Sequence, residues 1–181
     1  MPSGFVLAID GEQGSGKSTA VKTWMRRRGG GAAAQVIRVP SQPARHAVAS
    51  RLGGGETVVV LGDYSQDAQP FPGTDRLQRH IQPAAQDVIS KMTRQGTNVV
   101  FEGNLLFNYK MKDYLESAGI PHVFVVLEVP SHVAQQHRKK RGVDQSHTSL
   151  KRKATKLSNM KKKFDLHTVT PLQLDTLLSI L

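Results

Sequence analysis

Phosphate-binding chemistry is indicated first by the eight residues GEQGSGKS at positions 11–18. They fit the pattern G-x-x-x-x-G-K-[ST], whose glycines let successive main-chain N–H groups point at one anion. A helix that begins inside the motif adds the positive end of its dipole at the same place. Lys17 is then expected to reach the β- and γ-phosphates of a nucleoside triphosphate, and Ser18 to bind Mg²⁺. We assign the phosphate contacts to Gly14, Ser15, Gly16, Lys17, Ser18 and Thr19.

The surroundings of this loop fit a strand followed by a helix. The apolar run FVLAI at positions 5–9 precedes the loop, and a helical pattern over residues 17–28 follows it. A chance glycine-rich turn is the alternative, but a strand–loop–helix context is what a genuine phosphate-binding loop requires. The sequence therefore predicts that this P-loop, residues 11–18, binds a nucleoside triphosphate.

Two carboxylates end other apolar runs and could complete the chemistry of phosphoryl transfer. Glu102 follows the apolar run in VVFEG, a position where an acid often holds Mg²⁺ through water. Asp63 follows the apolar run in VVVLGDY, a position where a base could accept a proton. We assign Glu102 to the metal together with Ser18, and Asp63 to catalysis together with Lys17; the two acids could exchange roles. The alternative for each acid is to cap the following helix. Asp10, directly before the loop, is expected to support the loop's geometry.

Contacts to an acceptor substrate are expected in the segment that follows Asp63. Tyr64 could stack on a base, although an aromatic side chain in a loop also serves packing. Thr74 and Asp75 precede a helical pattern, so each is either a substrate contact or that helix's N-cap. Arg76 would lie near the helix start and could contact substrate phosphates. We therefore predict that the acceptor side contains Tyr64, Thr74, Asp75 and Arg76.

Positive charge is concentrated in one segment of the chain. The whole sequence has 25 Lys and Arg against 14 Asp and Glu, and residues 131–163 alone carry a net charge of +10. Concentrated positive charge favours a polyanionic partner such as DNA, whereas the alternative is a face that only keeps the protein in solution. Within this segment we expect a mobile lid over about 131–148, in which Arg138 and Arg141 contact phosphate oxygens, and a basic helix over about 148–163.

Apolar runs that alternate with helical patterns predict the scaffold. We expect strands over residues 5–9, 35–39, 57–61, 98–101 and 122–128, and a last short strand with its loop over 167–171. We expect helices over residues 17–28, 43–52, 75–95 with a kink or restart at Pro83, 109–118, from 131 onward, 148–163 and 171–181. Such alternation predicts a parallel sheet covered on both faces, with the ligand at the carboxyl ends of its strands. By its position, the loop 167–171 is then a candidate for the adenine pocket.

Composition narrows the class of protein. A chain of 181 residues is expected to form a single domain, residues 1–181. No apolar run reaches the roughly 20 residues of a membrane span, and no signal peptide is evident, so we expect a cytoplasmic protein without a membrane partner. The absence of cysteine excludes disulfides and thiolate chemistry, and the scattered histidines show no zinc-ligand spacing.

The order of these parts resembles the small P-loop kinases, which include nucleoside, nucleotide and polynucleotide kinases. The segment AIDGEQGSGKST at 8–19 looks much like the start of thymidylate kinases, and LEVP at 127–130 looks like their strand leading into a lid. Two departures count against thymidylate as substrate. The Asp-Arg-aromatic motif of that family is missing after VVFEGN, and Gln13 stands where an acid is usual. The resemblance implies an α/β, three-layer P-loop kinase fold with a central parallel sheet and a small basic lid, using ATP and Mg²⁺.

A narrower resemblance covers most of the chain. The segments LGDY at 61–64, FPGTDRL at 71–77 and VFEGN at 100–104 are similar to the bacteriophage 5-hydroxymethyluracil DNA kinases. Those enzymes phosphorylate the hydroxymethyl group of the base within polymeric DNA, a step toward hypermodified thymidine. The resemblance implies the same transfer here, with DNA containing a modified pyrimidine as the partner and the host-cell cytoplasm as the location.

Two other functions fit the same residues. A kinase of free nucleosides or nucleoside monophosphates would use the basic segment only as a lid. A DNA-stimulated ATPase or packaging factor would release phosphate without phosphorylating an acceptor, but the chain shows no second arginine-finger domain. No obligate protein partner is evident from the sequence.

Overall fold

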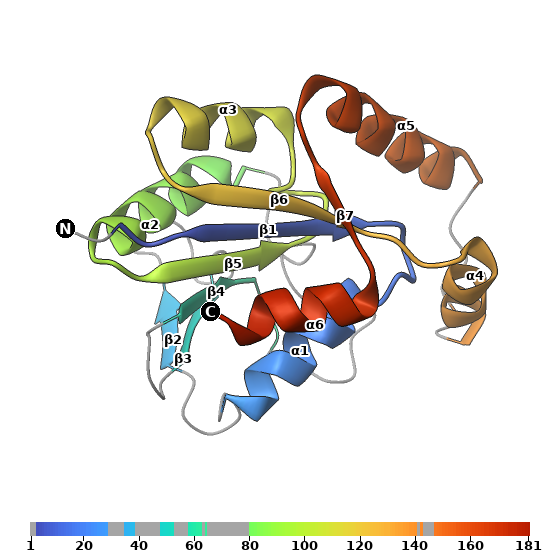
Figure 1. Cartoon of the computed structure of the whole chain (residues 1–181), viewed down its shortest axis with the longest axis horizontal. Coiled ribbons are helices and arrows are strands. Elements are labelled where there is room, and N and C mark those ends of the chain that lie inside the picture. The colour runs from blue at the N-terminus through green and yellow to red at the C-terminus, as the bar shows by residue number, and fades with distance from the viewer. Residues whose placement is uncertain are drawn as a thin grey trace.

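The computed structural model describes residues 3–28, 35–38, 48–52, 58–62, 64, 80–140, 142 and 147–181. These residues form a seven-stranded sheet with the strand order β2-β3-β4-β5-β1-β6-β7, and helices cover both of its faces (Figure 1). Successive strands β5, β1 and β6 are not in sequence order, so helical crossovers connect them, as a parallel α/β sheet requires.

The strands fall into a parallel group and an antiparallel pair. Strands β4, β5, β1, β6 and β7 pair in parallel, whereas β2 and β3 are antiparallel to each other and β3 is antiparallel to β4. Their bounds are β1 Val6–Gly11, β2 Gln35–Arg38, β3 Val48–Leu52, β4 Val58–Leu61, β5 Asn98–Glu102, β6 His122–Leu127 and β7 His167–Val169. The five-stranded parallel group confirms the predicted fold class.

The helices divide between the two faces of the sheet. Helices α1 and α6 cover one face, and α2, α3 and α5 cover the other (Figure 1). The bounds are α1 Lys17–Arg27, α2 Gln82–Arg94, α3 Tyr109–Ser117, α4 Ser131–Lys140, α5 His147–Lys163 and α6 Pro171–Ser179. Among the described helices, none is both long and apolar enough to cross a bilayer.

Strand β1 shows how the two hydrophobic layers arise. Successive side chains of a strand point to opposite faces, so Val6 and Ala8 pack with α2, α3 and α5. Leu7 and Ile9 pack with α1 and α6. All six residues of β1 are buried because the strand lies in the middle of the sheet with helices on both faces. This alternation also decides the face to which the next polar side chains point.

One predicted helix is wrong in part. Residues 48–52 of the helix expected over 43–52 form strand β3, which pairs with β2 on one side and β4 on the other. Backbone pairing with two neighbouring strands overrides the weak local preference of VASRL, a segment whose composition does not specify a strand. The other residues of that predicted helix lie outside the described part of the chain.

The helix expected over 75–95 is described from Gln82 onward. Pro83 lies in its first turn, a position where proline is tolerated because the N–H has no partner within the helix. Pro83 therefore starts this part of the helix, in agreement with the predicted restart. The predicted residues 75–79 lie outside the described part.

Candidate functional site

The P-loop lies at the carboxyl end of β1, the central strand of the five-stranded parallel group. Strand β1 ends at Gly11 and helix α1 begins at Lys17, so residues 12–16 form the loop between the carboxyl end of the strand and the N-terminus of the helix. Gly16 precedes the helix with a φ of 95°, a left-handed conformation that favours glycine. The strand–loop–helix arrangement predicted from residues 5–28 is confirmed.

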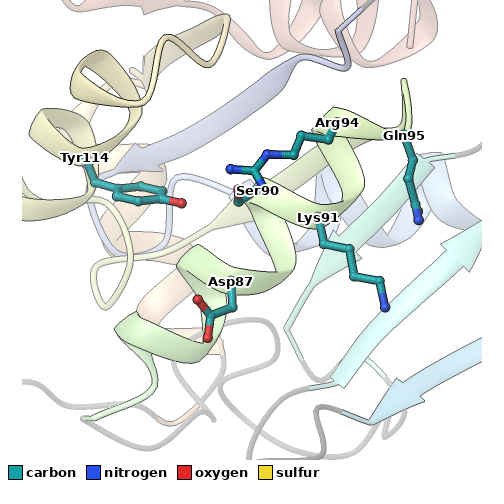
Figure 2. Close-up of a pocket in the computed structure, with 6 residues that line it drawn as sticks. All are labelled: Asp87, Ser90, Lys91, Arg94, Gln95 and Tyr114. Atoms are coloured by element: carbon teal, nitrogen blue, oxygen red, sulfur yellow. The ribbon is translucent and has the colours of Figure 1, made fainter.

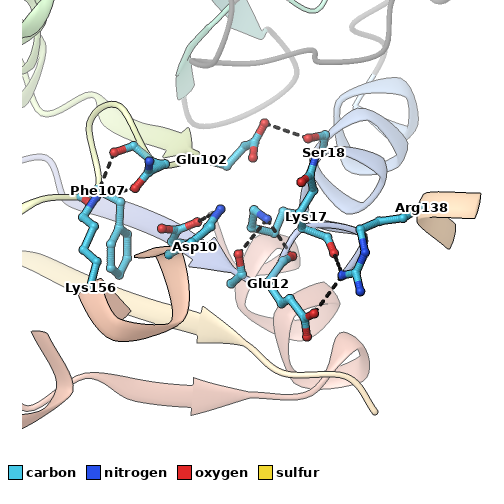
Figure 3. Close-up of polar contacts among 12 residues, drawn as sticks. Asp10, Glu12, Lys17, Ser18, Glu102, Phe107, Arg138 and Lys156 are labelled. Carbon is cyan, nitrogen blue, oxygen red and sulfur yellow. Dashed lines mark hydrogen bonds and ion pairs between the residues drawn. The ribbon is translucent and has the colours of Figure 1, made fainter. Parts of the chain in front are cut away.

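The ammonium group of Lys17 lies against the loop itself. Its Nζ atom donates hydrogen bonds to the carbonyl oxygens of Gly11 at 3.0 Å and Glu12 at 3.1 Å (Figure 3). Lys17 is only 7% exposed, so the charge is held at the loop with little contact with bulk water. A buried ammonium ion at this place favours an anionic ligand strongly, because low local dielectric strengthens charge interactions.

Ser18 and Glu102 come together from two different elements. The Ser18 Oγ atom donates a hydrogen bond of 2.9 Å to Oε1 of Glu102, and the Tyr64 hydroxyl donates one of 3.4 Å to the same oxygen. Glu102 ends β5, beside β1 in the sheet, and its side chain is 1% exposed. Ser18 and Glu102 therefore contact each other, and their role as metal ligands stays a prediction. Hydroxyl and carboxylate oxygens are the hard ligands that Mg²⁺ prefers, so this donor set fits that ion.

Helix α4 packs directly against the P-loop. The Arg138 Nη1 atom donates hydrogen bonds to Oε1 of Glu12 at 2.7 Å and to the carbonyl oxygen of Gln13 at 2.6 Å (Figure 3). The His137 Nδ1 atom lies 2.8 Å from the carbonyl oxygen of Gly14, so the imidazole donates there. The predicted lid arginine Arg138 is thus brought to the loop. Glu12 and His137 were not predicted as its companions, because no local pattern links residues that are 123 to 126 positions apart in the chain.

A buried ion pair lies beneath the loop. Asp10 is 0% exposed, and its Oδ1 atom lies 3.0 Å from Nζ of Lys153 on α5. Among the residues that the structure describes, its Oδ2 atom has no hydrogen-bond partner. Asp10 follows Ile9 in β1, so it points to the face that α5 covers. The prediction that Asp10 supports the loop stays a prediction, but its partner Lys153 was not foreseen.

Other lysines of α5 also bond within the protein. Lys156 donates to the carbonyl oxygens of Asn104 at 3.0 Å and Phe107 at 2.6 Å, in the loop that follows Glu102 (Figure 3). Lys161 pairs with Glu128, and Lys163 lies 3.7 Å from a carboxylate oxygen of Asp113. Together with Lys153, these lysines fasten α5 to the ends of three strands and to α3. Part of the charge assigned to DNA binding therefore has a structural use.

A cavity of about 490 Å³ opens beside the P-loop. Its walls come from the start of α1, the end of β6, α4 and the start of α6. The lining residues are Ser15, Gly16, Thr19, Ala20, Leu127, Val129, Val133, His137, Lys140 and Pro171. A mostly apolar wall next to a phosphate cradle suits the base of a nucleotide. Of the loop 167–171 expected to form the adenine pocket, Pro171 lines this cavity.

A second cavity, of about 580 Å³, lies between α2 and α3 (Figure 2). It is lined by Asp87, Ser90, Lys91, Arg94, Gln95 and Tyr114. Gly4 donates a backbone hydrogen bond to Thr93 of α2, so this end of the helix adjoins the start of β1. The P-loop is at the other end of that strand, about 20 Å away for six extended residues. This cavity is therefore separate from the candidate site.

Several predicted site residues fall outside the described part of the chain. They are Asp63, Thr74, Asp75, Arg76 and Arg141. Gly14, Ser15, Gly16 and Thr19 lie in or beside the P-loop, as the motif requires. Within the described residues, no group of three or more His, Asp or Glu side chains could hold a metal ion by itself.

Comparison with known proteins places the chain in a family. A family profile described as AAA domain (AAA_33) matches residues 6–167, which include every element from β1 to the start of β7. A solved structure titled "Crystal structure of APE1195" is 14% identical, covering 100% of this chain and 98% of that chain, with a TM-score of 0.46. No curated protein matches the chain.

Proposed function

The chain belongs to the AAA domain family, and from this premise we propose that it is an ATP-dependent DNA kinase. Membership of this family makes it a P-loop nucleotide-binding protein of the kinase-like type. We infer further that it transfers the γ-phosphoryl group of ATP to the hydroxymethyl group of 5-hydroxymethyluracil in DNA.

The observation that carries the kinase proposal is the contact between Ser18 and Glu102. Their 2.9 Å hydrogen bond joins the first turn of α1, which also contains Lys17, to the end of β5. Phosphoryl transfer needs a phosphate cradle and oxygen ligands for a metal at adjacent positions. A chain that merely contained a glycine-rich turn would not be expected to place a buried carboxylate on the hydroxyl that follows the lysine.

The residues would then act as follows. The loop amides and Lys17 hold the β- and γ-phosphates, and Arg138 exchanges the Glu12 carboxylate for a phosphate oxygen. Ser18 and Glu102 would hold Mg²⁺, which when bound neutralises charge on the phosphates. The acceptor oxygen attacks the γ-phosphorus, the bond to the β-phosphate oxygen breaks, and ADP leaves. A carboxylate accepts the hydroxyl proton, for which we propose Asp63.

The DNA acceptor rests on two features of the chain. The segments LGDY, FPGTDRL and VFEGN are similar to the hydroxymethyluracil DNA kinases, and residues 131–163 carry a net charge of +10. A base within duplex DNA must leave the stack to reach such a site, which costs a few kcal/mol. Attraction between the basic segment and the DNA backbone would offset part of that cost.

One observation favours the alternative of a free nucleoside or nucleotide kinase. Four lysines of α5 bond to other parts of the protein, namely Lys153, Lys156, Lys161 and Lys163. These contacts reduce the positive charge that is available for a polymer. In that case the basic segment would serve to fasten and close the site.

Labelled ATP distinguishes the two acceptors. The protein is incubated with hydroxymethyluracil-containing DNA and, separately, with the free nucleoside and its monophosphate, and products are identified by mass spectrometry. Label on the DNA base supports the proposal, and label on the small molecules alone supports the alternative.

Lys17→Ala tests the site itself. Loss of a buried cation from the phosphate cradle should lower the transfer rate at least about 100-fold, while DNA binding persists. Lys91→Ala, which removes an exposed cation from the far cavity, is the matched control and should retain full activity. Full activity in the Lys17 variant would reject the assignment.

A further inference from the structure

Helix α5 presents two faces of different character. Its inner face packs Leu157 and Met160 into the core and directs lysines to partners within the protein. Its outer face consists of exposed polar and cationic residues and contains no acid. Those residues are Thr148, Lys151, Arg152, Thr155, Ser158, Asn159 and Lys162.

The spacing of these residues makes one continuous stripe. Positions 148, 151, 152, 155, 158, 159 and 162 recur at intervals of three and four, so they lie on one side of an α-helix. We call them the outer stripe. Lys151 and Lys162 are eleven residues apart, or about 16 Å along the helix axis. One strand of B-form duplex carries about five phosphates over that length.

Among the described residues, the cations of the outer stripe have no carboxylate partner, unlike several lysines on the rest of α5. Within the described part of the chain, Lys151, Arg152 and Lys162 form no ion pair, whereas Lys153, Lys161 and Lys163 each pair with a carboxylate. Carboxylates therefore offset the charge of Lys153 and Lys161, and more weakly that of Lys163, which is 55% exposed at its side chain. The charge that remains on α5 for a partner is concentrated on the stripe.

The stripe also lies close to the P-loop. Lys153, on the opposite side of the same helix, contacts Asp10, which directly precedes the loop. A helix with its side chains is about 10–12 Å across, so a chain bound on the stripe would pass about one helix diameter from the strand end that carries the loop.

We propose that the outer stripe binds the phosphate backbone of the acceptor nucleic acid. Lys151, Arg152 and Lys162 would neutralise phosphates, while the Ser158 hydroxyl and the Asn159 amide between them supply hydrogen-bond donors; the Thr155 hydroxyl already donates to the Lys151 carbonyl oxygen. The inference rests on the proposed function for the identity of the polymer, but it concerns binding and not transfer. Specifically, it divides the basic helix into lysines that hold the fold together and cations that contact DNA.

A pair of charge-matched variants tests the stripe. Lys151→Gln with Arg152→Gln removes one lysine and one arginine from the stripe, and Lys91→Gln with Arg94→Gln removes the same pair from exposed positions on α2 near the opposite end of the sheet. Binding of each to a labelled duplex is measured by fluorescence anisotropy at several salt concentrations, without ATP.

The stripe variant should bind DNA more weakly, and its plot of log affinity against log salt should be less steep by about 2, because each lost phosphate contact removes about 0.9 from the slope. The control variant should keep the wild-type slope. Equal losses in both variants, or an unchanged slope in the stripe variant, would overturn the proposal. Should the double variant fail to fold, Lys162→Gln is the second test, with an expected change in slope of about 1.

Failure of this inference can be distinguished from failure of the proposed function. If the protein phosphorylates DNA but the stripe variant binds like wild type, the stripe is wrong and the kinase stands. If the stripe variant loses affinity although wild type transfers no phosphate, the stripe stands and the kinase is wrong.

Discussion

At the scale of single residues, Asp10 combines a negative charge with complete burial. Its cationic partner among the described residues is Lys153, which is 17% exposed at its side chain. Burying a charge is costly unless it is paired, and removing one partner leaves the cost uncompensated. The position of Asp10 directly before Gly11 means that its surroundings also set the entry to the P-loop.

Lys153→Met should therefore destabilise the protein by about 2 kcal/mol, below the 3–5 kcal/mol of a wholly buried pair because Lys153 keeps some access to water. Asp10→Asn in addition should recover part of that loss, since the remaining buried group is then neutral. Urea unfolding of the two single variants and the double variant measures the coupling. Lys162→Met, at an exposed position of the same helix, should change little. Additive losses in the double variant would show that the pair does not interact.

At the scale of elements, the P-loop is shaped by α4 as well as by its own glycines. Gly14 has a φ of 86°, and a Cβ atom there would lie 2.4 Å from the carbonyl oxygen of Ala134 on α4. Close approach of α4 is also what brings Arg138 and His137 onto the loop. The helix and the loop therefore form one unit.

Gly14→Ala should disrupt the packing of α4 against the P-loop. The added Cβ introduces both backbone strain and a steric clash, so nucleotide affinity and stability should both fall. The loss in stability from backbone strain alone should be about 1–3 kcal/mol. Gly119→Ala is the control, because its φ of 63° imposes strain but no atom of the described residues beyond its chain neighbours lies within 4 Å of the added Cβ. It should lose stability and keep its affinity for nucleotide, as measured by calorimetry. Equal affinity in the Gly14 variant and wild type would contradict a role for α4 contact in shaping the loop.

At the scale of the whole molecule, three layers position the site. The sheet brings the ends of β1 and β5 side by side, α1 supplies the loop lysine from one face, and α5 supplies Lys153 and Lys156 from the other (Figure 1). Some of the positive charges of α5 hold these layers together, and in our proposal the others bind DNA. Ligand binding to such a site should therefore stabilise the entire fold.

Mg²⁺ and a non-hydrolysable ATP analogue should raise the unfolding temperature. At a ligand concentration 100 times the Kd, binding to the native state alone adds about 2.7 kcal/mol of stability. The measurement is differential scanning fluorimetry at increasing ligand concentration, with Lys17→Ala as the variant that should show little shift. A wild-type melting temperature that does not change when the analogue is added would contradict a nucleotide site at the P-loop.

Much of this arrangement could be predicted from local patterns. The P-loop, its flanking strand and helix, and the buried strands around Val59, Val100 and Val125 follow from short-range signals that do not depend on the rest of the chain. The pairing of Ser18 with Glu102 was also foreseeable, because the carboxyl ends of parallel strands meet at one edge of the sheet. Strand β3 was missed since its strand character comes from pairing with β2 and β4.

The sequence by itself determined that a phosphate cradle stands at a strand end and that positive charge is concentrated in residues 131–163. Only the tertiary structure decided how that charge is used. It turns Lys153 toward Asp10 and Lys156 toward the loop after Glu102, and it leaves Lys151, Arg152 and Lys162 facing water. Helical periodicity places side chains on one face or another, but the partners on each face come from distant segments that only folding brings within a few ångströms.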